Sequence, residues 1–122
     1  MKEGTQFWQG IETLVAEHPL VIDRKAGSRH PRFPDFVYPI DSGYLEGTSA
    51  VDGGGVDVWV GSLGETTVTG VVCTVDLCKH DAELKVLIGC TADEMRRIEA
   101  VHNQAGMAGL LVVRSESAGE QG

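Results

Sequence analysis

Apolar residues recur at helical spacing in the first part of the chain and alternate with polar residues after it. In TQFWQGIETLVAE, residues 5–17, apolar side chains stand at positions 7, 11, 14 and 15, and Pro19 closes the segment, so we predict an amphipathic helix. Leu20 to Asp23 is predicted to form a short strand. The next stretch, AGSRHPRFPDF at residues 26–36, has prolines three residues apart, which excludes a helix and favours an extended, irregular path.

The rest of the chain is predicted to be mainly β. Three segments are rich in β-branched residues and are separated by glycine-containing or charged turns: residues 56–61, 66–78 and 84–89. Thr91 with Glu94 three residues later is a capping box, which predicts a helix over residues 92–105 that Gly106 ends. A last strand is predicted at 109–114. The sequence thus predicts one domain over residues 1–114, mainly β or α+β with flanking helices, and a disordered tail over 115–122.

Composition and charge restrict the partners of this domain. With 122 residues, 42% of them apolar, the chain can form a single domain with a modest core. Its 10 basic and 18 acidic residues give a net charge of −8, which repels nucleic acid and anionic membranes. A phosphate-bearing ligand is repelled too, unless divalent cations reverse the local field. No stretch is apolar enough for a membrane span or a signal peptide, so we predict a cytoplasmic protein.

The three cysteines do not indicate a disulfide framework. They are odd in number and contain no C-x-x-C pair. Cys73 and Cys90 lie in apolar, strand-like surroundings where buried free thiols are common. A zinc site from Cys78, His80 and Cys90 is an alternative, although the spacing fits no standard pattern.

Acidic residues gather at the predicted strand ends. The stretch DGGGVD, residues 52–57, has three glycines between two aspartates, and Asp76 and Asp81 flank the turn between two strands. If these ends meet, the four carboxylates need cations to neutralise them, and oxygen ligands without histidine favour Mg²⁺, Ca²⁺ or Mn²⁺. The alternative is a hairpin loop with solvated acids and two ordinary turn residues.

Three ordered stretches between Ile22 and Ala82 resemble the soluble inorganic pyrophosphatases of the magnesium-dependent, barrel-forming family I. IDRKAGSRHPRF resembles the family's stretch in which an acid on a strand precedes a Gly-Ser turn and basic residues. VYPIDSGYLEGTSAVDGGGVDVWV resembles its aromatic-Pro-x-Asn-Tyr-Gly-Tyr segment and the signature D-x-D-P-x-D-V that follows. VDLCKHDAELK resembles its later aspartate pair, because Asp76 and Asp81 keep the five-residue interval.

The resemblance implies a small OB-like, five-stranded closed β-barrel with an N-terminal helix and a helix of the C-terminal half packed outside. It implies Mg²⁺, or Mn²⁺, as the cofactor and hydrolysis of pyrophosphate, or a related small phosphoanhydride, by metal-activated water. The metal ligands that it implies are Asp52, Asp57, Asp76 and Asp81. The implied catalytic acids are Asp52, Asp57 and Asp23, and the implied substrate-binding residues are Arg29, Arg32, Tyr44 and Lys85. For Tyr44, packing at the barrel rim is the alternative.

The chain departs from the family pattern mainly at the phosphate-binding positions. Gly54 stands where the family has an acid that helps to activate water, and Ser42 stands where it has a tyrosine. Glu83 replaces a lysine, although Lys85 lies two residues further on and, with a strand period of two, points to the same face. The metal-binding acids are thus kept while the phosphate-binding side chains are fewer.

Three hypotheses about function follow from this pattern. The first is a magnesium-dependent pyrophosphatase-like hydrolase, slow because its phosphate-binding side chains are depleted. The second is a non-catalytic relative that binds a divalent cation or a phosphate ligand. The third is a structural or interaction domain that keeps only the barrel. A homo-oligomer is compatible with the resemblance, but the sequence does not indicate which face a partner would cover.

Overall fold

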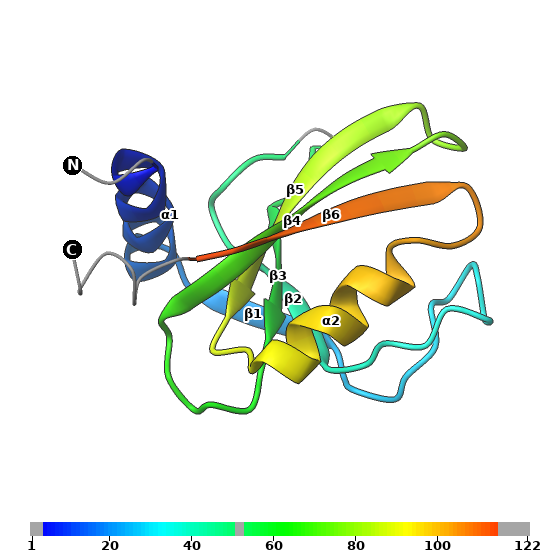
Figure 1. The fold of residues 1–122 in the computed structure, drawn as a ribbon, viewed down its shortest axis with the longest axis horizontal. Coiled ribbons are helices and arrows are strands. Elements are labelled where there is room, and N and C mark those ends of the chain that lie inside the picture. The colour runs from blue at the N-terminus through cyan, green and yellow to red at the C-terminus, as the bar shows by residue number, and fades with distance from the viewer. Residues whose placement is uncertain (1–3, 51–52, 115–122) are drawn as a thin grey trace.

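A computed structural model of the chain describes residues 4–50 and 53–114. It contains two helices and six strands (Figure 1). In chain order these are α1 (Thr5–Glu17), β1 (Leu20–Arg24), β2 (Asp41–Leu45), β3 (Val56–Val60), β4 (Val68–Asp76), β5 (Asp81–Ile88), α2 (Ala92–Val101) and β6 (Met107–Val113). The first predicted helix is confirmed at both ends, and the predicted strands are found with boundaries shifted by at most three residues. None of the helices in the described part is long and apolar enough to cross a membrane.

The strands form one mixed sheet rather than the five-stranded closed barrel that the resemblance implied. Its order is β1-β2-β3-β5-β4-β6, so it has six strands and its two outer strands are not joined by hydrogen bonds. β3 and β5 are parallel, and the other neighbouring pairs are antiparallel. The parallel pairing arises because β4 lies outside β5 instead of between β3 and β5. This arrangement places β3 and β5 side by side in the middle of the sheet.

Each face of the curved sheet is covered by one helix, and this divides the core into two clusters. Met95 and Ile98 of α2 pack on Trp59, Val72 and Leu87. On the opposite face, α1 packs on a second cluster, which contains Ile11, Leu45, Val58, Val68, Val86 and Ile88. Successive residues of a strand point to opposite faces, so β3 and β5 contribute side chains to both clusters. In Figure 1, α1 lies at the end of the molecule where β6 ends, and α2 runs lengthwise beside β6.

Strand β2 was not among the strands that we predicted from the residue pattern. Its sequence, DSGYL, begins with three residues that have low β-propensity. A Cβ atom at Gly43 would overlap the carbonyl oxygen of Val21 in the neighbouring strand, so the close approach of β1 requires glycine here. The same residue that weakens the strand pattern is therefore needed for the pairing with β1.

Helix α2 begins as predicted but ends earlier. The Thr91 hydroxyl accepts a hydrogen bond from the Glu94 backbone N–H at 3.1 Å, and the Glu94 carboxylate accepts one from the Thr91 backbone N–H at 2.8 Å, which is the expected capping box. The helix ends at Val101 and not near residue 105. Gly106 does not end it, because the Asn103 side chain already bonds the Glu99 carbonyl and both backbone groups of Gly109.

The cysteines do not share a site. Cys90 is buried as expected, and burial with the nearby Glu94 charge raises the pKa of its thiol to about 12. Cys73 is exposed, contrary to the expectation, because its face of β4 is not covered by α1 at that point. Cys78 is exposed in the turn after β4. The zinc alternative that joined Cys78 to the buried Cys90 is therefore not supported.

Candidate functional site

The glycines at positions 53–55 turn the chain sharply and let it approach β2 closely just before β3 begins. Gly53 has a φ of 86°, a left-handed conformation that glycine adopts without strain. A Cβ atom at Gly55 would lie 2.7 Å from the Leu45 carbonyl oxygen and 2.9 Å from Cδ2 of Tyr44. Backbone conformation at Gly53 and close packing at Gly55 thus explain why these two positions require glycine. Asp52, predicted to be a metal ligand and catalytic acid, lies outside the described residues.

Asp57 forms an ionic cluster with two residues of β5. The Lys85 ammonium lies 2.8 Å from Asp57 Oδ2 and 3.0 Å from Glu83 Oε1. Desolvation alone would lower the pKa of Lys85, but the Asp57 and Glu83 carboxylates more than offset it, so that pKa is raised. Lys85 therefore stays charged. The prediction that Lys85 and Glu83 point to the same face is confirmed by this contact.

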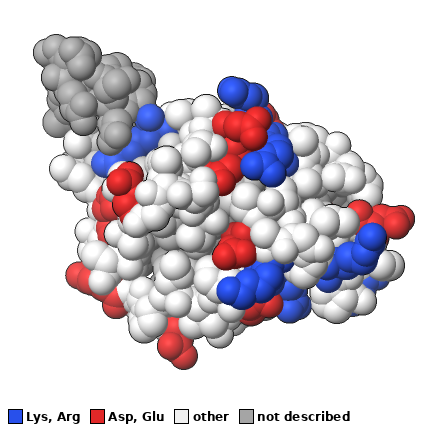
Figure 2. Space-filling model, turned by 90° about the horizontal axis from the view of Figure 1, so that it is seen from below, with Lys and Arg blue, Asp and Glu red and all other residues white. Residues whose placement is uncertain are grey.

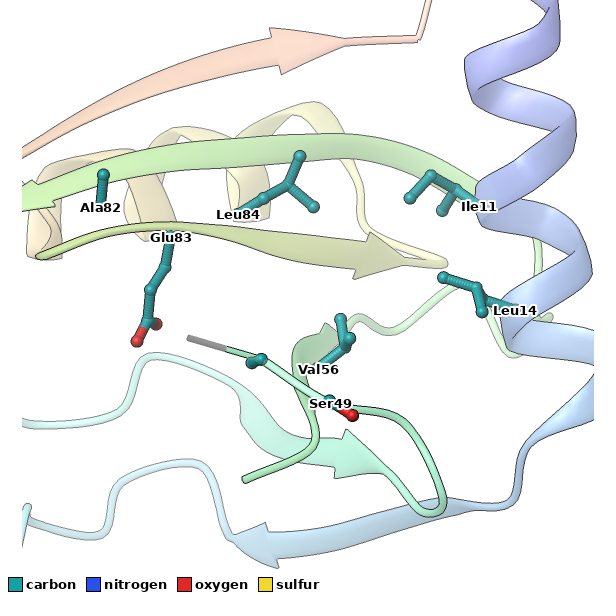
Figure 3. A pocket seen from close by; sticks show the side chains of 8 residues that line it. Ile11, Leu14, Ser49, Val56, Ala82, Glu83 and Leu84 are labelled. Carbon is teal, nitrogen blue, oxygen red and sulfur yellow. The ribbon is translucent and has the colours of Figure 1, made fainter. Parts of the chain in front are cut away.

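Glu83 is the most buried member of this cluster. Its side chain is 8% exposed, compared with 15% for Lys85 and 39% for Asp57. Its second oxygen, Oε2, is buried and has no hydrogen-bond partner. Figure 3 shows that the Glu83 side chain points to the opposite side of β5 from Ala82 and Leu84, toward the loop that carries Ser49. A buried carboxylate oxygen without a partner is costly, so Glu83 is a position where a ligand would be favourable.

A pocket of about 250 Å³ adjoins Glu83 beneath helix α1. Ile11 and Leu14 extend into it from α1 and face Leu84 and Val56 (Figure 3). The remaining lining residues are Ser49, Ala50, Ala82 and Glu83. This lining is mainly apolar and contains no basic side chain, so the pocket does not suit a phosphate group.

Asp76 and Asp81 lie opposite each other at the ends of β4 and β5. Residues directly opposite in an antiparallel pair share a face, so both aspartates lie on the face that carries Glu83 and Lys85. Asp76 Oδ1 accepts hydrogen bonds from the backbone N–H groups of Cys78 at 2.9 Å and Lys79 at 3.1 Å. Asp76 therefore closes the hairpin turn, as the simpler interpretation of the sequence expected. Its second carboxylate oxygen is not used by these bonds.

Positive charges from three separate parts of the chain act on His30. The pKa of His30 is lowered by burial and then by the positive charges of Arg24, Arg32 and Lys79. Lys79 belongs to the turn between Asp76 and Asp81, whereas the arginines belong to β1 and the irregular segment after it. Figure 1 shows that segment and the β4–β5 hairpin reaching toward the same end of the molecule, and Figure 2 shows basic side chains beside acidic ones at that end.

The other predicted substrate and catalytic residues differ in their surroundings. Tyr44 pairs with Asp57 across β2 and β3, so the two side chains share a face. Arg29 is exposed and donates a hydrogen bond to the Pro34 carbonyl of its own loop at 2.9 Å. Asp23 is exposed at the irregularity of β1, and Arg32 is exposed in the loop that follows. The structure thus brings Asp57, Tyr44 and Lys85 together.

An aromatic cluster borders the ionic one on the same face. Trp59 is 2% exposed and donates a hydrogen bond from Nε1 to His102 Nε2 at 3.2 Å. Tyr38 and Phe36 pack against this pair. Burial, followed by the charge of Lys85, lowers the pKa of His102 to about 4. Trp59 is therefore a packing residue, and in this chain it is not exposed for contact with an oligomeric partner.

Carboxylate oxygens flank Lys85, but the three described members of the predicted four-aspartate cage, Asp57, Asp76 and Asp81, do not form one group. Among residues 4–50 and 53–114, no three His, Cys, Asp or Glu side chains converge closely enough to hold a metal ion. Asp57 and Glu83, however, supply carboxylate oxygens on both sides of an ammonium, and Glu83 Oε2 is unpartnered. Hard cations such as Mg²⁺ take such oxygen ligands.

Two features of this site were not found by sequence reasoning. Glu83 was noted as the loss of a family lysine, not as a buried carboxylate that binds Lys85. Lys79 and Arg24 were not singled out, although both contribute positive charge beside the hairpin. The available signal was the alternation D-A-E-L-K at 81–85, which places three ionisable residues on one face of a strand.

Comparison with known proteins shows the fold of this chain. No protein-family model matches it, and no curated protein matches its sequence. Among solved structures, an inorganic pyrophosphatase from Neisseria gonorrhoeae matches with a TM-score of 0.63, 18% identity and 84% of each chain covered. An inorganic pyrophosphatase from Coxiella burnetii matches with a TM-score of 0.54 and 15% identity, over 84% of this chain and 88% of that one. An inorganic pyrophosphatase from Helicobacter pylori matches with a TM-score of 0.52 and 16% identity, over 81% of this chain and 85% of that one. The chain therefore has a pyrophosphatase-like fold.

Proposed function

We propose that the protein is a phosphoanhydride hydrolase that acts on pyrophosphate with the help of a divalent cation, Mg²⁺ or Mn²⁺. The observation that carries this proposal is the meeting of opposite charges at one end of the sheet. Lys79 belongs to the turn between Asp76 and Asp81, and its positive charge acts on His30 together with those of Arg24 and Arg32. Carboxylates suit a cation and basic side chains suit phosphate oxygens, so one end of the fold offers both kinds of ligand.

Each group has a role in this proposal. Binding of the cation would have to draw Asp57, Asp76 and Asp81, which do not converge in the structure, together with Asp52. When bound, the cation would polarise a phosphoryl oxygen and acidify a water molecule. Arg32 would bind phosphate oxygens with its forked guanidinium, and Tyr44, next to Asp57, would donate a hydrogen bond.

The substrate itself has to overcome an acidic protein. The chain carries a net charge of −8, so an unaccompanied pyrophosphate is repelled at long range. A metal-complexed pyrophosphate carries less negative charge and is repelled less. We therefore expect turnover to depend on the divalent cation for substrate capture as well as for chemistry.

A second candidate function, a non-catalytic module that binds a cation or a phosphate ligand, is favoured by the missing base. Gly54 has no side chain to activate water, and Glu83 places a negative charge where the related enzymes are expected to have a lysine. Loss of one positioned base commonly lowers a rate by about 10²–10⁴-fold. A module of this kind would bind pyrophosphate with the cation but release no phosphate.

The deciding experiment is phosphate release from pyrophosphate, with and without millimolar Mg²⁺, by the parent and by Asp57→Asn. We expect Mg²⁺-dependent release by the parent and a loss of at least about 10²-fold in the variant, because the substitution removes a ligand charge and a partner of Lys85. The matched control is Asp93→Asn on α2, an exposed residue paired only with Arg97, which removes the same charge and should leave the rate unchanged.

The two candidates give different results in this experiment. Release that is equal in the parent and in Asp57→Asn would come from a contaminating enzyme and would contradict the hydrolase. If the parent releases no phosphate, titration calorimetry with pyrophosphate and Mg²⁺ distinguishes the binding module from a domain without ligand.

A further inference from the structure

The position of Lys85 is that of a cation held by two carboxylates. Its ammonium contacts Asp57 on the neighbouring parallel strand and Glu83 two residues back on its own strand, at 2.8 and 3.0 Å. At these distances both contacts are charge-assisted hydrogen bonds. The side chains of Lys85 and Glu83 are largely withdrawn from solvent, with exposures of 15% and 8%, whereas that of Asp57 is 39% exposed. An ammonium thus occupies the space between the carboxylates.

This cluster is short of positive charge. Two carboxylates and one ammonium sum to −1, and the excess resides in the most buried of the three groups. Glu83 Oε2 is buried and lacks any hydrogen-bond partner. In a purely structural ionic cluster, the lone pairs of a buried carboxylate are satisfied, because an unsatisfied one is costly. The unpartnered oxygen is therefore an independent sign that the cluster is completed by a ligand of positive charge.

A divalent cation would offset the excess negative charge that a single ammonium leaves. An ammonium is a point charge on a flexible four-carbon stem, so it can leave without a change in the backbone. A Mg²⁺ or Mn²⁺ ion could bind oxygens of Asp57 and Glu83 and would change the local charge from −1 to +1 even if Lys85 stays nearby. The same ion would thus convert a site that repels phosphate into one that attracts it.

We infer that Lys85 acts as a built-in cation: its ammonium fills a divalent-cation site formed by Asp57 and Glu83, and a metal ion binds there by displacing it. Displacement frees Lys85 on the same sheet face, where it can contact an anionic ligand held by the ion. Glu83 is then a metal ligand, although the sequence comparison marked it only as a lost lysine. The inference rests on the proposed function for the choice of a divalent ion.

The test is Mn²⁺ binding, measured by titration calorimetry without any phosphate. In the parent, the ion must compete with Lys85. In Lys85→Met the competitor is absent, so we expect the affinity for Mn²⁺ to rise at least about tenfold. Lys85→Arg keeps the positive charge and should bind as weakly as the parent. Arg96→Met removes the same charge from an exposed position on α2 and controls for net charge; it should change the affinity less than about twofold.

A second pair of variants tests the role of Glu83. Adding Glu83→Gln to Lys85→Met should abolish the gain, because the site then loses one of its two charged ligands. Unchanged or weaker Mn²⁺ binding by Lys85→Met would overturn the inference. If Lys85→Met does not fold, Glu83→Gln alone decides: Mn²⁺ binding should weaken at least about tenfold, and unchanged binding would overturn the inference.

The Mn²⁺ titrations and the phosphate-release assay can contradict the inference about Lys85 and the proposed hydrolase independently of each other. Tighter Mn²⁺ binding by Lys85→Met together with an absence of phosphate release supports the built-in cation and contradicts the hydrolase. Phosphate release that depends on Asp57, together with equal Mn²⁺ affinities in the parent and Lys85→Met, supports the hydrolase and contradicts the built-in cation.

Discussion

Two regions on one face of the sheet are neighbours along the same strands, but one is a buried apolar cluster and the other is a charged, partly exposed cluster. Trp59 and Leu87 belong to the α2 cluster and are 2% and 0% exposed. Asp57 and Lys85, two residues earlier on the same strands, form the ionic cluster with Glu83. Two residues of strand span only about 7 Å. Within that distance the face changes from a dry core to a charged, partly wet site.

The difference lies in how well each region satisfies its polar groups. In the dry region, Trp59 Nε1 has His102 Nε2 as its acceptor, and His102 Nδ1 lies 3.5 Å from Met107 Sδ. Both side chains are neutral and partnered. In the ionic region, a buried oxygen of Glu83 is unpartnered and the carboxylates outnumber the ammonium. The dry region therefore favours stability, whereas the ionic region keeps a buried oxygen unsatisfied at a cost in stability.

The largest expected effect is at the dry region. Trp59→Ala should lower the free energy of unfolding by about 3–5 kcal/mol, because it opens a cavity and leaves His102 without its donor. Trp59→Phe keeps most of the volume but loses the N–H group, and should cost about 1–3 kcal/mol. Urea denaturation followed by circular dichroism measures both changes.

Trp8→Ala is the matched control for this substitution. Trp8 lies on α1, is half-buried and stacks under the Arg114 guanidinium, so its loss should cost less than that of Trp59. Equal losses at both tryptophans would contradict the view that the Trp59 region is the main source of stability.

The next effect is a dependence of stability on pH. The folded pKa of His102 is about 4, below its ordinary value of 6.5, so the unfolded chain binds this proton more readily. Neutral His102 therefore contributes to the free energy of unfolding. This contribution is fully present above pH 6.5 and is lost as the pH falls from 6.5 to about 4. Its size is on the order of 3 kcal/mol. Protonated Nε2 could no longer accept from Trp59, so tryptophan fluorescence should change over the same range.

His102→Gln should flatten this part of the pH profile. Glutamine keeps an acceptor for Trp59 but does not titrate. His80→Asn, in the exposed hairpin turn, is the control; asparagine tolerates the positive φ of 59° found there. An unchanged profile in His102→Gln would assign the acid sensitivity to carboxylates instead.

The smallest effect should come from the ionic region. Glu83→Gln removes a buried charge that has one unsatisfied oxygen, while Lys85 keeps Asp57 as its partner. The substitution loses an ion pair but also removes the cost of burying a charge, and these two effects nearly cancel. The free energy of unfolding should therefore change by less than about 1 kcal/mol without divalent cations. A loss above about 2 kcal/mol in urea denaturation would make Glu83 a structural residue and remove the contrast between the regions.

Much of the fold was predictable where the signal was local. The helix over residues 5–17 and the Thr91–Glu94 capping box were found because they depend on side chains within a few residues of each other. Strand β2 was missed because Gly43 is required by β1, which a strand propensity does not register. The end of α2 was misplaced because Asn103, and not Gly106, satisfies the last turn and the start of β6.

The candidate site was predictable only in part for the same reason. The alternation along β5 placed Glu83 and Lys85 on one face, and this is confirmed. The contact between Lys85 and Asp57 joins residues 28 positions apart and depends on β3 lying next to β5. No local pattern reports which strands are neighbours.

The sequence by itself determined most of the elements, the acidic balance and the set of charged groups available at the strand ends. Those properties follow from local backbone preferences and from composition. The tertiary structure alone decided that β4 lies outside β5, so that Asp57 faces Lys85, and that Trp59 meets His102. Pairing of distant segments depends on the burial of the whole core, and for this reason it decides which carboxylate is neutralised and which remains available for a ligand.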